Sequence, residues 1–198
     1  MQNGPAQEDT PLRALPQWQQ LLVDTFTHIQ HTRMRGVPVI NTQLAVNADC
    51  FVRWQDYFLG VLITPWFMNL MLLPAGEESA GQMQQQRIGE KQTHVFPSGP
   101  YEFIVGAEAG LGRYQSCSLF SPMFDFCDRA AAEETAAAIL RELMKMENLE
   151  VLDSGRDETP NTTGEVNGAA PMSDSDGNQQ SLLEKPFSRR QLFTELRR

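Results

Sequence analysis

One stretch near the middle of the chain limits its fold more than any other. The sequence YFLGVLITPWFMNLMLLP, residues 57–74, is almost continuously apolar. A membrane-spanning helix needs about 20 apolar residues, and this run is shorter and is interrupted by Thr64-Pro65 and by Asn69. Short apolar runs bounded by turn residues are typical of buried strands. We therefore predict two buried strands joined at Thr64-Pro65-Trp66, and no membrane insertion.

Further strands and two amphipathic helices account for the rest of the periodic sequence. Apolar residues at helical spacing predict one helix from Leu15 to Ile29 and another over about 128–147, the second capped by Asp125 or Asp128. β-branched and aromatic residues between turn residues mark strands at 42–52, 57–64, 67–74, 101–108 and 113–120. The predicted fold class is therefore α+β: an antiparallel sheet of about five strands flanked by an N-terminal and a C-terminal helix.

The periodic pattern ends near Leu152. Residues 153–180 contain only Val166 and Met172 as large apolar side chains, so this segment has too little apolar surface to offset the entropy of ordering it. We predict a globular domain over residues 1–152 and a disordered acidic tail, with a basic C-terminal end, over 153–198.

Charge and cysteine content bear on partners and compartment. The formal net charge is -9, which gives no basic footprint for nucleic acid. No basic segment followed by an apolar one is found at the N-terminus, and the three cysteines include no CxxC pair. These features favour a cytoplasmic protein with reduced thiols.

Candidate catalytic and metal-binding residues are few. Cys117 lies between two serines, but strand alternation puts it on the same face as Leu119, where a cysteine acts as a small buried apolar residue. His28 and His31 are three apart on a helix but have no evident third ligand. The sequence DSDGN at 174–178 does not have the spacing of a calcium loop. We expect no cofactor and no bound metal.

Two longer blocks resemble a known family. GVLITPWFMNLMLLP at 60–74 resembles the Ile-Thr-Pro-Trp-Phe/Met segment of the HybE/HupJ family of [NiFe]-hydrogenase assembly chaperones. FPSGPYEFIVGAEAGLGRYQSCSLFSPM at 96–123 resembles that family's second block, in which a Phe-x-Val-Gly strand leads to Ser-Cys-Ser-Leu-x-Ser-Pro. The resemblance covers about residues 15–147. It implies a non-catalytic cytoplasmic chaperone that binds an immature [NiFe]-hydrogenase subunit before export by the twin-arginine route.

The residues also leave a second class of function open, a small thiol-dependent enzyme or redox protein centred on Cys117. Some relatives carry a fused rubredoxin, but the absence of paired CxxC motifs excludes its iron site here. Ser188-Arg189-Arg190 resembles the core of a twin-arginine signal, although only a few residues follow it. One interpretation is a basic terminal segment, and another is a tail that competes with a partner's twin-arginine signal peptide.

Two clusters of aromatic residues and methionines are the candidate partner-binding residues. Each follows a strand that ends in a Thr-Pro or Ser-Pro step, where side chains can project at the edge of the sheet. We predict that the clusters meet in an exposed apolar groove, with Trp66 and Met123 as its anchors. The candidates are Trp66, Phe67, Met68 and Met71 in the first cluster and Met123, Phe124 and Phe126 in the second.

Overall fold

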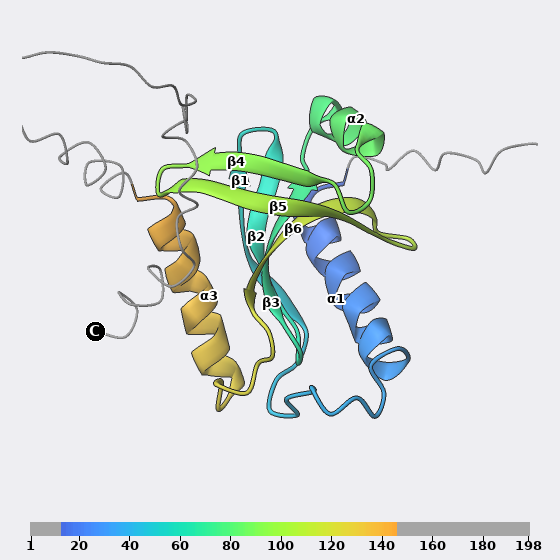
Figure 1. Cartoon of the computed structure of the whole chain (residues 1–198), viewed down its shortest axis with the longest axis vertical. Helices are drawn as coiled ribbons and strands as arrows, with labels where there is room; N and C mark the ends of the chain where they lie inside the picture. The colour runs from blue at the N-terminus through green and yellow to red at the C-terminus, as the bar shows by residue number, and fades with distance from the viewer. Residues whose placement is uncertain (1–12, 146–198) are drawn as a thin grey trace, which may run out of the picture.

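The computed structural model describes residues 13–145, which form one antiparallel sheet with helices on both faces (Figure 1). The six strands are ordered β1-β2-β3-β6-β5-β4 across the sheet. The elements are α1 (Leu15–His31), β1 (Asn47–Trp54), β2 (Tyr57–Ile63), β3 (Met68–Pro74), α2 (Glu77–Gln85), β4 (Lys91–Phe96), β5 (Gly99–Glu108), β6 (Gly112–Phe120) and α3 (Arg129–Leu143). The α+β class predicted from the sequence is confirmed, with six strands in place of about five.

The apolar run at 57–74 forms the central hairpin of β2 and β3. Every residue of β2 is buried, because α1 covers one face of the sheet and α3 covers the other. This double coverage explains why the run shows no alternation of apolar and polar residues. Thr64 closes the turn: its backbone N–H donates to the carbonyl of Phe67 at 2.8 Å, and its Oγ1 accepts from the Phe67 N–H at 2.9 Å. No helix within residues 13–145 is long and apolar enough to span a membrane.

Both predicted helices are present and are held by specific contacts. The buried face of α1 carries Trp18, whose indole N–H donates to the carbonyl of Pro74 at 3.2 Å. Asp128 caps α3, since its side chain accepts from the Ala131 N–H at 2.8 Å. Of the two candidate caps, it is therefore Asp128 that caps the helix.

Two elements were not expected from the sequence. The edge strand β4 has only Phe96 fully buried, so its sequence KQTHVF lacks an apolar face. The short helix α2 buries only Ser79 and Met83. It is anchored by polar contacts instead, because Asp56 accepts a hydrogen bond from the Ser79 backbone N–H at 2.8 Å. Elements that are held by hydrogen bonds at the rim of a sheet give little hydrophobic periodicity to read.

Gly60 in β2 permits a close cross-strand contact and supplies a test of the packing. It pairs with Phe51 of β1, and a Cβ at position 60 would overlap the Phe51 ring. We expect Gly60→Ala to lower the free energy of unfolding by about 1 to 3 kcal/mol, because the ring has to move into a filled core. Urea unfolding measures this change.

Gly81 in α2 provides the matched control. A Cβ there meets nothing within 4 Å, so Gly81→Ala is expected to stabilise the chain by about 0.5 to 1 kcal/mol through helix propensity. Equal effects of the two substitutions would contradict the contact between Gly60 and Phe51.

Candidate functional site

The two turns that follow the Thr-Pro and Ser-Pro steps lie side by side at one end of the sheet. Ser121 Oγ donates to the Trp66 carbonyl at 3.4 Å. Asn41 bridges the turns, because its backbone N–H donates to Pro65 O at 2.8 Å while its side-chain amide donates to Met123 O at 2.9 Å. Chain segments far apart in sequence are therefore fastened together here by hydrogen bonds.

The seven candidate partner-binding residues divide between the two faces of the sheet. Trp66, Phe67 and Met71 pack with α1 on one face. Met68, Met123 and Phe126 belong to the core under α3 on the other face. Phe124 points to solvent and is 60% exposed.

Burial separates the candidates further. Met68 and Met123 are each 0% exposed and Met71 is 1% exposed, whereas Phe67 is partly exposed. The expectation that Trp66 and Met123 are exposed anchors differs from their positions in the structure, where Trp66 is 9% exposed and Met123 is 0% exposed. For Met123 the reason is that the turn after Ser121-Pro122 directs it under α3 and its neighbour Phe124 outward.

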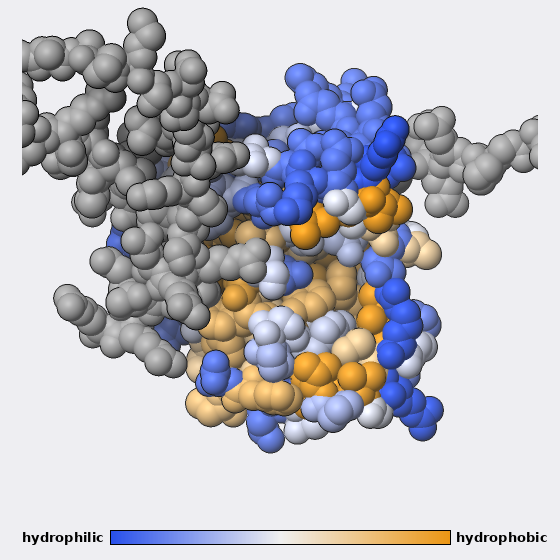
Figure 2. All heavy atoms as spheres, in the orientation of Figure 1, coloured by the Kyte–Doolittle hydropathy of each residue, from blue (hydrophilic) through white to orange (hydrophobic). Residues whose placement is uncertain are grey.

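Apolar surface gathers at the same end of the molecule. Figure 2 shows hydrophilic residues over α2 and the upper rim, and largely apolar residues over the lower half of the same face. The exposed side chains of Val37 and Phe124 belong to the loops at this lower end. An apolar patch next to hydrophilic surface is typical of a site for protein partners.

A cavity of about 270 Å³ lies on the α1 face of the sheet, between α1, β3 and the first half of β6. One wall is aromatic and aliphatic. Phe67 is central to it, with its ring at 5.7 Å from that of Phe26 and 5.5 Å from that of Trp66, both edge to face. The apolar lining consists of Phe26, Ile29, Met34, Trp66, Phe67 and Met71, and the polar lining of Arg33, Asn69, Glu108, Tyr114 and Ser116.

The polar side of the cavity carries compensated charges. Arg33 and Glu108 form an ion pair at 2.7 Å that joins the turn after α1 to the end of β5. Burial, with a smaller effect of the Glu108 carboxylate, raises the pKa of Tyr114 to about 12, although Arg33 opposes this shift. A tyrosine phenol is neutral at physiological pH even without this shift, and Arg33 and Glu108 compensate each other, so this side of the cavity bears no net charge.

A second hollow adjoins the first at Met34, which lines both. Its volume is about 640 Å³, and it is bordered by the end of α1 and by the following loop through Gly36, Val37 and Ile40. Together the two hollows have more volume than a single side chain fills.

Three residues that the sequence singled out as candidates, Trp66, Phe67 and Met71, line the apolar wall of the cavity, but none of its polar lining residues was singled out. Asn69 gave the one available signal, because it is a polar residue inside an otherwise apolar strand. Arg33 and Glu108 gave none, since their pairing depends on the meeting of α1 with the end of β5.

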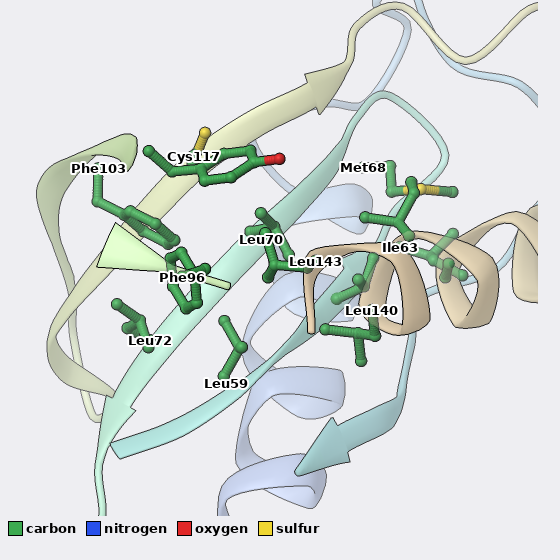
Figure 3. Close-up of a cluster of buried hydrophobic side chains, with 14 of the residues drawn as sticks. Leu59, Ile63, Met68, Leu70, Leu72, Phe96, Phe103, Cys117, Leu140 and Leu143 are labelled. Atoms are coloured by element: carbon green, nitrogen blue, oxygen red, sulfur yellow. The ribbon is translucent and has the colours of Figure 1, made fainter. Parts of the chain in front are cut away.

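Cys117 does not lie in a reactive setting. It is 5% exposed and sits on the α3 face among the side chains of the core, near Phe103 and Leu70 in Figure 3. His94, on β4, directs its Nε2 to Gln115 Oε1 at 2.6 Å. A thiol nucleophile needs access to its substrate and a base within reach, so this burial gives no support to the thiol-enzyme alternative.

The predicted histidine pair lies in the last turn of α1. Within residues 13–145, no group of three or more histidine, cysteine, aspartate or glutamate side chains could hold a metal ion. DSDGN and Ser188-Arg189-Arg190 lie outside the described residues, as do the predicted tail and the boundary of the globular domain at residue 152.

Comparison with known proteins decides the family. The sequence profile described as "[NiFe]-hydrogenase assembly, chaperone, HybE" matches residues 17–195. The chain belongs to this family. The resemblance of the blocks at 60–74 and 96–123 to HybE-family proteins is thereby confirmed.

Individual relatives agree with the HybE-family assignment. The "Hydrogenase expression/formation protein HupJ" of Bradyrhizobium diazoefficiens is 39% identical over 127 residues, which are 64% of this chain and 72% of that protein. The "Probable rubredoxin HupJ" of Rhodobacter capsulatus is 40% identical over 146 residues, which are 73% of this chain and 51% of that protein. The chain thus spans only about half the length of the Rhodobacter protein. The family description and the name of the Bradyrhizobium protein place the HybE family in hydrogenase maturation.

The fold agrees with that of a solved member of the HybE family. The solution structure of HybE from Escherichia coli matches 83% of this chain and 91% of its own length, with a TM-score of 0.52 and 20% identity. This likeness concerns the fold alone, and it supports the α+β architecture.

Proposed function

We propose that this chain is a non-catalytic cytoplasmic chaperone that binds an immature [NiFe]-hydrogenase subunit during maturation, before the subunit is exported. Family membership supports the class of function. The observation that carries the binding role is the cavity beside α1, whose wall of aromatic residues and methionines is open to solvent through Phe67. Such side chains repack around varied apolar segments, which suits the recognition of an unfinished subunit.

The partner surface extends from this cavity to the exposed Phe124. Trp66 belongs to the cavity wall, and its turn is hydrogen-bonded to Ser121 at the start of the segment that carries Phe124. A twin-arginine signal peptide includes an apolar stretch, so it is one candidate for the bound segment. Deleting the signal peptide from the subunit and repeating the capture tests this candidate directly.

Replacement of the accessible aromatic residues tests the proposed surface. Phe67→Ala and Phe124→Ala are each expected to weaken capture of the subunit by about 1 to 3 kcal/mol, a typical loss for an interface aromatic residue. The measurement is co-purification from cells that make the hydrogenase, followed by titration of the captured subunit with each purified variant.

Val95→Ala is the matched control, because Val95 is an apolar side chain that is 68% exposed on the edge strand β4, outside the cavity. It should capture the subunit as the parent does. Thermal melts of all three variants establish that they are folded. Unchanged capture by both phenylalanine variants would show that the subunit binds elsewhere.

A further inference from the structure

Asn69 has an unsatisfied hydrogen-bonding group at the cavity. It lies in β3 between Met68 and Leu70, and its side chain lines the cavity on the α1 face. Its Oδ1 is buried and has no hydrogen-bond partner among the described residues. A buried acceptor without a donor destabilises the free protein, so such groups are uncommon unless they serve a function.

The side-chain carboxamide of Asn69 can form hydrogen bonds with the backbone of another polypeptide segment. It offers two N–H donors and an oxygen acceptor, and its terminal torsion is broad, so either end can be turned toward the cavity. In an extended chain the N–H and the C=O of one residue, which belong to the two peptide groups that flank it, point to the same side. The carboxamide can therefore pair side by side with that residue, donating one hydrogen bond to its C=O and accepting one from its N–H.

The charges in the cavity lining limit which chemical groups can occupy it. Arg33 and Glu108 neutralise each other at 2.7 Å, and the Tyr114 phenol is uncharged at physiological pH. An ionised side chain that entered the cavity would lose hydration without finding an unpaired opposite charge there. The lining therefore favours an uncharged, apolar occupant.

Size and backbone chemistry favour an extended conformation of that occupant. A helix with its side chains is about 10 Å across, which is too wide for a cavity of about 270 Å³. The interior of a helix also has its peptide groups paired internally, so it could not satisfy Asn69. An extended segment leaves its peptide groups available and can place single side chains in the hollow.

We propose that the cavity receives an extended apolar segment of the partner, in which the backbone N–H and C=O of one residue pair with the Asn69 carboxamide while one side chain of the segment packs against Phe67. This inference rests on the proposed chaperone function for the source of the segment. It adds to that function the extended conformation of the bound segment, and it names Asn69 as the residue that hydrogen-bonds to the backbone of the segment.

The first experiment compares stability with binding. Asn69→Leu keeps a similar side-chain size and removes the unpaired carboxamide. The variant is expected to melt at the same temperature as the parent or a higher one, and to capture the immature subunit about tenfold more weakly, as the loss of two hydrogen bonds implies.

Ser118→Ala is the control. Ser118 is the cross-strand neighbour of Asn69 and is exposed, and it does not line the cavity. It should leave both properties unchanged. A lower melting temperature for Asn69→Leu with undiminished capture would make Asn69 a structural residue and overturn the proposal.

A second experiment needs no hydrogenase subunit. N-acetylphenylalanine methylamide, which has an apolar side chain between two peptide groups, is titrated into the isotope-labelled full chain. The analogue O-acetyl-3-phenyllactic acid methylamide, in which an ester oxygen replaces the phenylalanine N–H, is titrated in parallel. We expect N-acetylphenylalanine methylamide to shift the side-chain amide signals of Asn69 and to bind several-fold more tightly than this ester analogue.

The outcomes are separable. Equal binding of the two probes, or shifts confined to surfaces away from the cavity, would overturn the pairing with Asn69 while leaving the chaperone function intact. If the parent chain captures no hydrogenase subunit, the proposed function fails. The probe titration then still decides whether the Asn69 carboxamide hydrogen-bonds to a peptide backbone.

Discussion

Replacing Trp18 by alanine is expected to lower the free energy of unfolding by about 3 to 5 kcal/mol. The side chain is 0% exposed in the core between α1 and the sheet, and its indole N–H donates to Pro74 O at 3.2 Å. The substitution leaves a large void and an unpaired carbonyl at the end of β3. Urea unfolding followed by circular dichroism measures the change.

Trp18→Phe is the matched control, because it keeps most of the buried apolar surface and removes the hydrogen bond to Pro74. Its cost should be clearly smaller than that of Trp18→Ala. If both variants unfolded at the same urea concentration as the parent, α1 would not be packed on the sheet as described.

Replacing Met123 by alanine is expected to cost about 2 to 5 kcal/mol of stability. Met123 is 0% exposed in the core under α3, so its truncation creates a cavity. The neighbouring Phe124 is 60% exposed, and Phe124→Ala should change stability by no more than about 0.5 kcal/mol. Thermal unfolding of the two variants side by side makes the comparison.

This pair of variants also separates the two possible roles of the turn after Ser121-Pro122. If Met123→Ala is as stable as the parent but captures the subunit more weakly, Met123 contacts the partner, as the sequence predicted. A destabilised Met123→Ala variant and a stable Phe124→Ala variant would assign core packing to the first residue and leave the second for the partner.

The sequence contained most of the fold because most elements bury a periodic set of apolar side chains. The helical spacing of apolar residues predicted α1, whose buried face includes Trp18 and Phe26, and the apolar run at 57–74 predicted the hairpin of β2 and β3. β4 and α2 could not be predicted in this way, because α2 depends on a hydrogen bond to Asp56 and β4 on its pairing with β5.

The candidate site could be predicted only in part. Alternation tells which face of a strand a residue occupies, but it stops where the strand ends. Met123 and Phe124 are adjacent and similarly apolar, yet they differ completely in exposure. Their positions depend on how the turn is held by Asn41, which lies 82 residues before Met123 in the chain.

The strand order has a consequence for how the chain folds. β1-β2-β3 and β4-β5-β6 are two meanders of strands that are consecutive in sequence, and the pairing of β3 with β6 joins them. The other ladders close short loops, so the β3–β6 ladder is the main non-local step and is expected to form late. The cavity lies across this ladder, with Asn69 and Met71 from β3 and Tyr114 and Ser116 from β6. A segment seated there would hold the two halves together by mass action, and binding a client would therefore also slow the separation of the meanders.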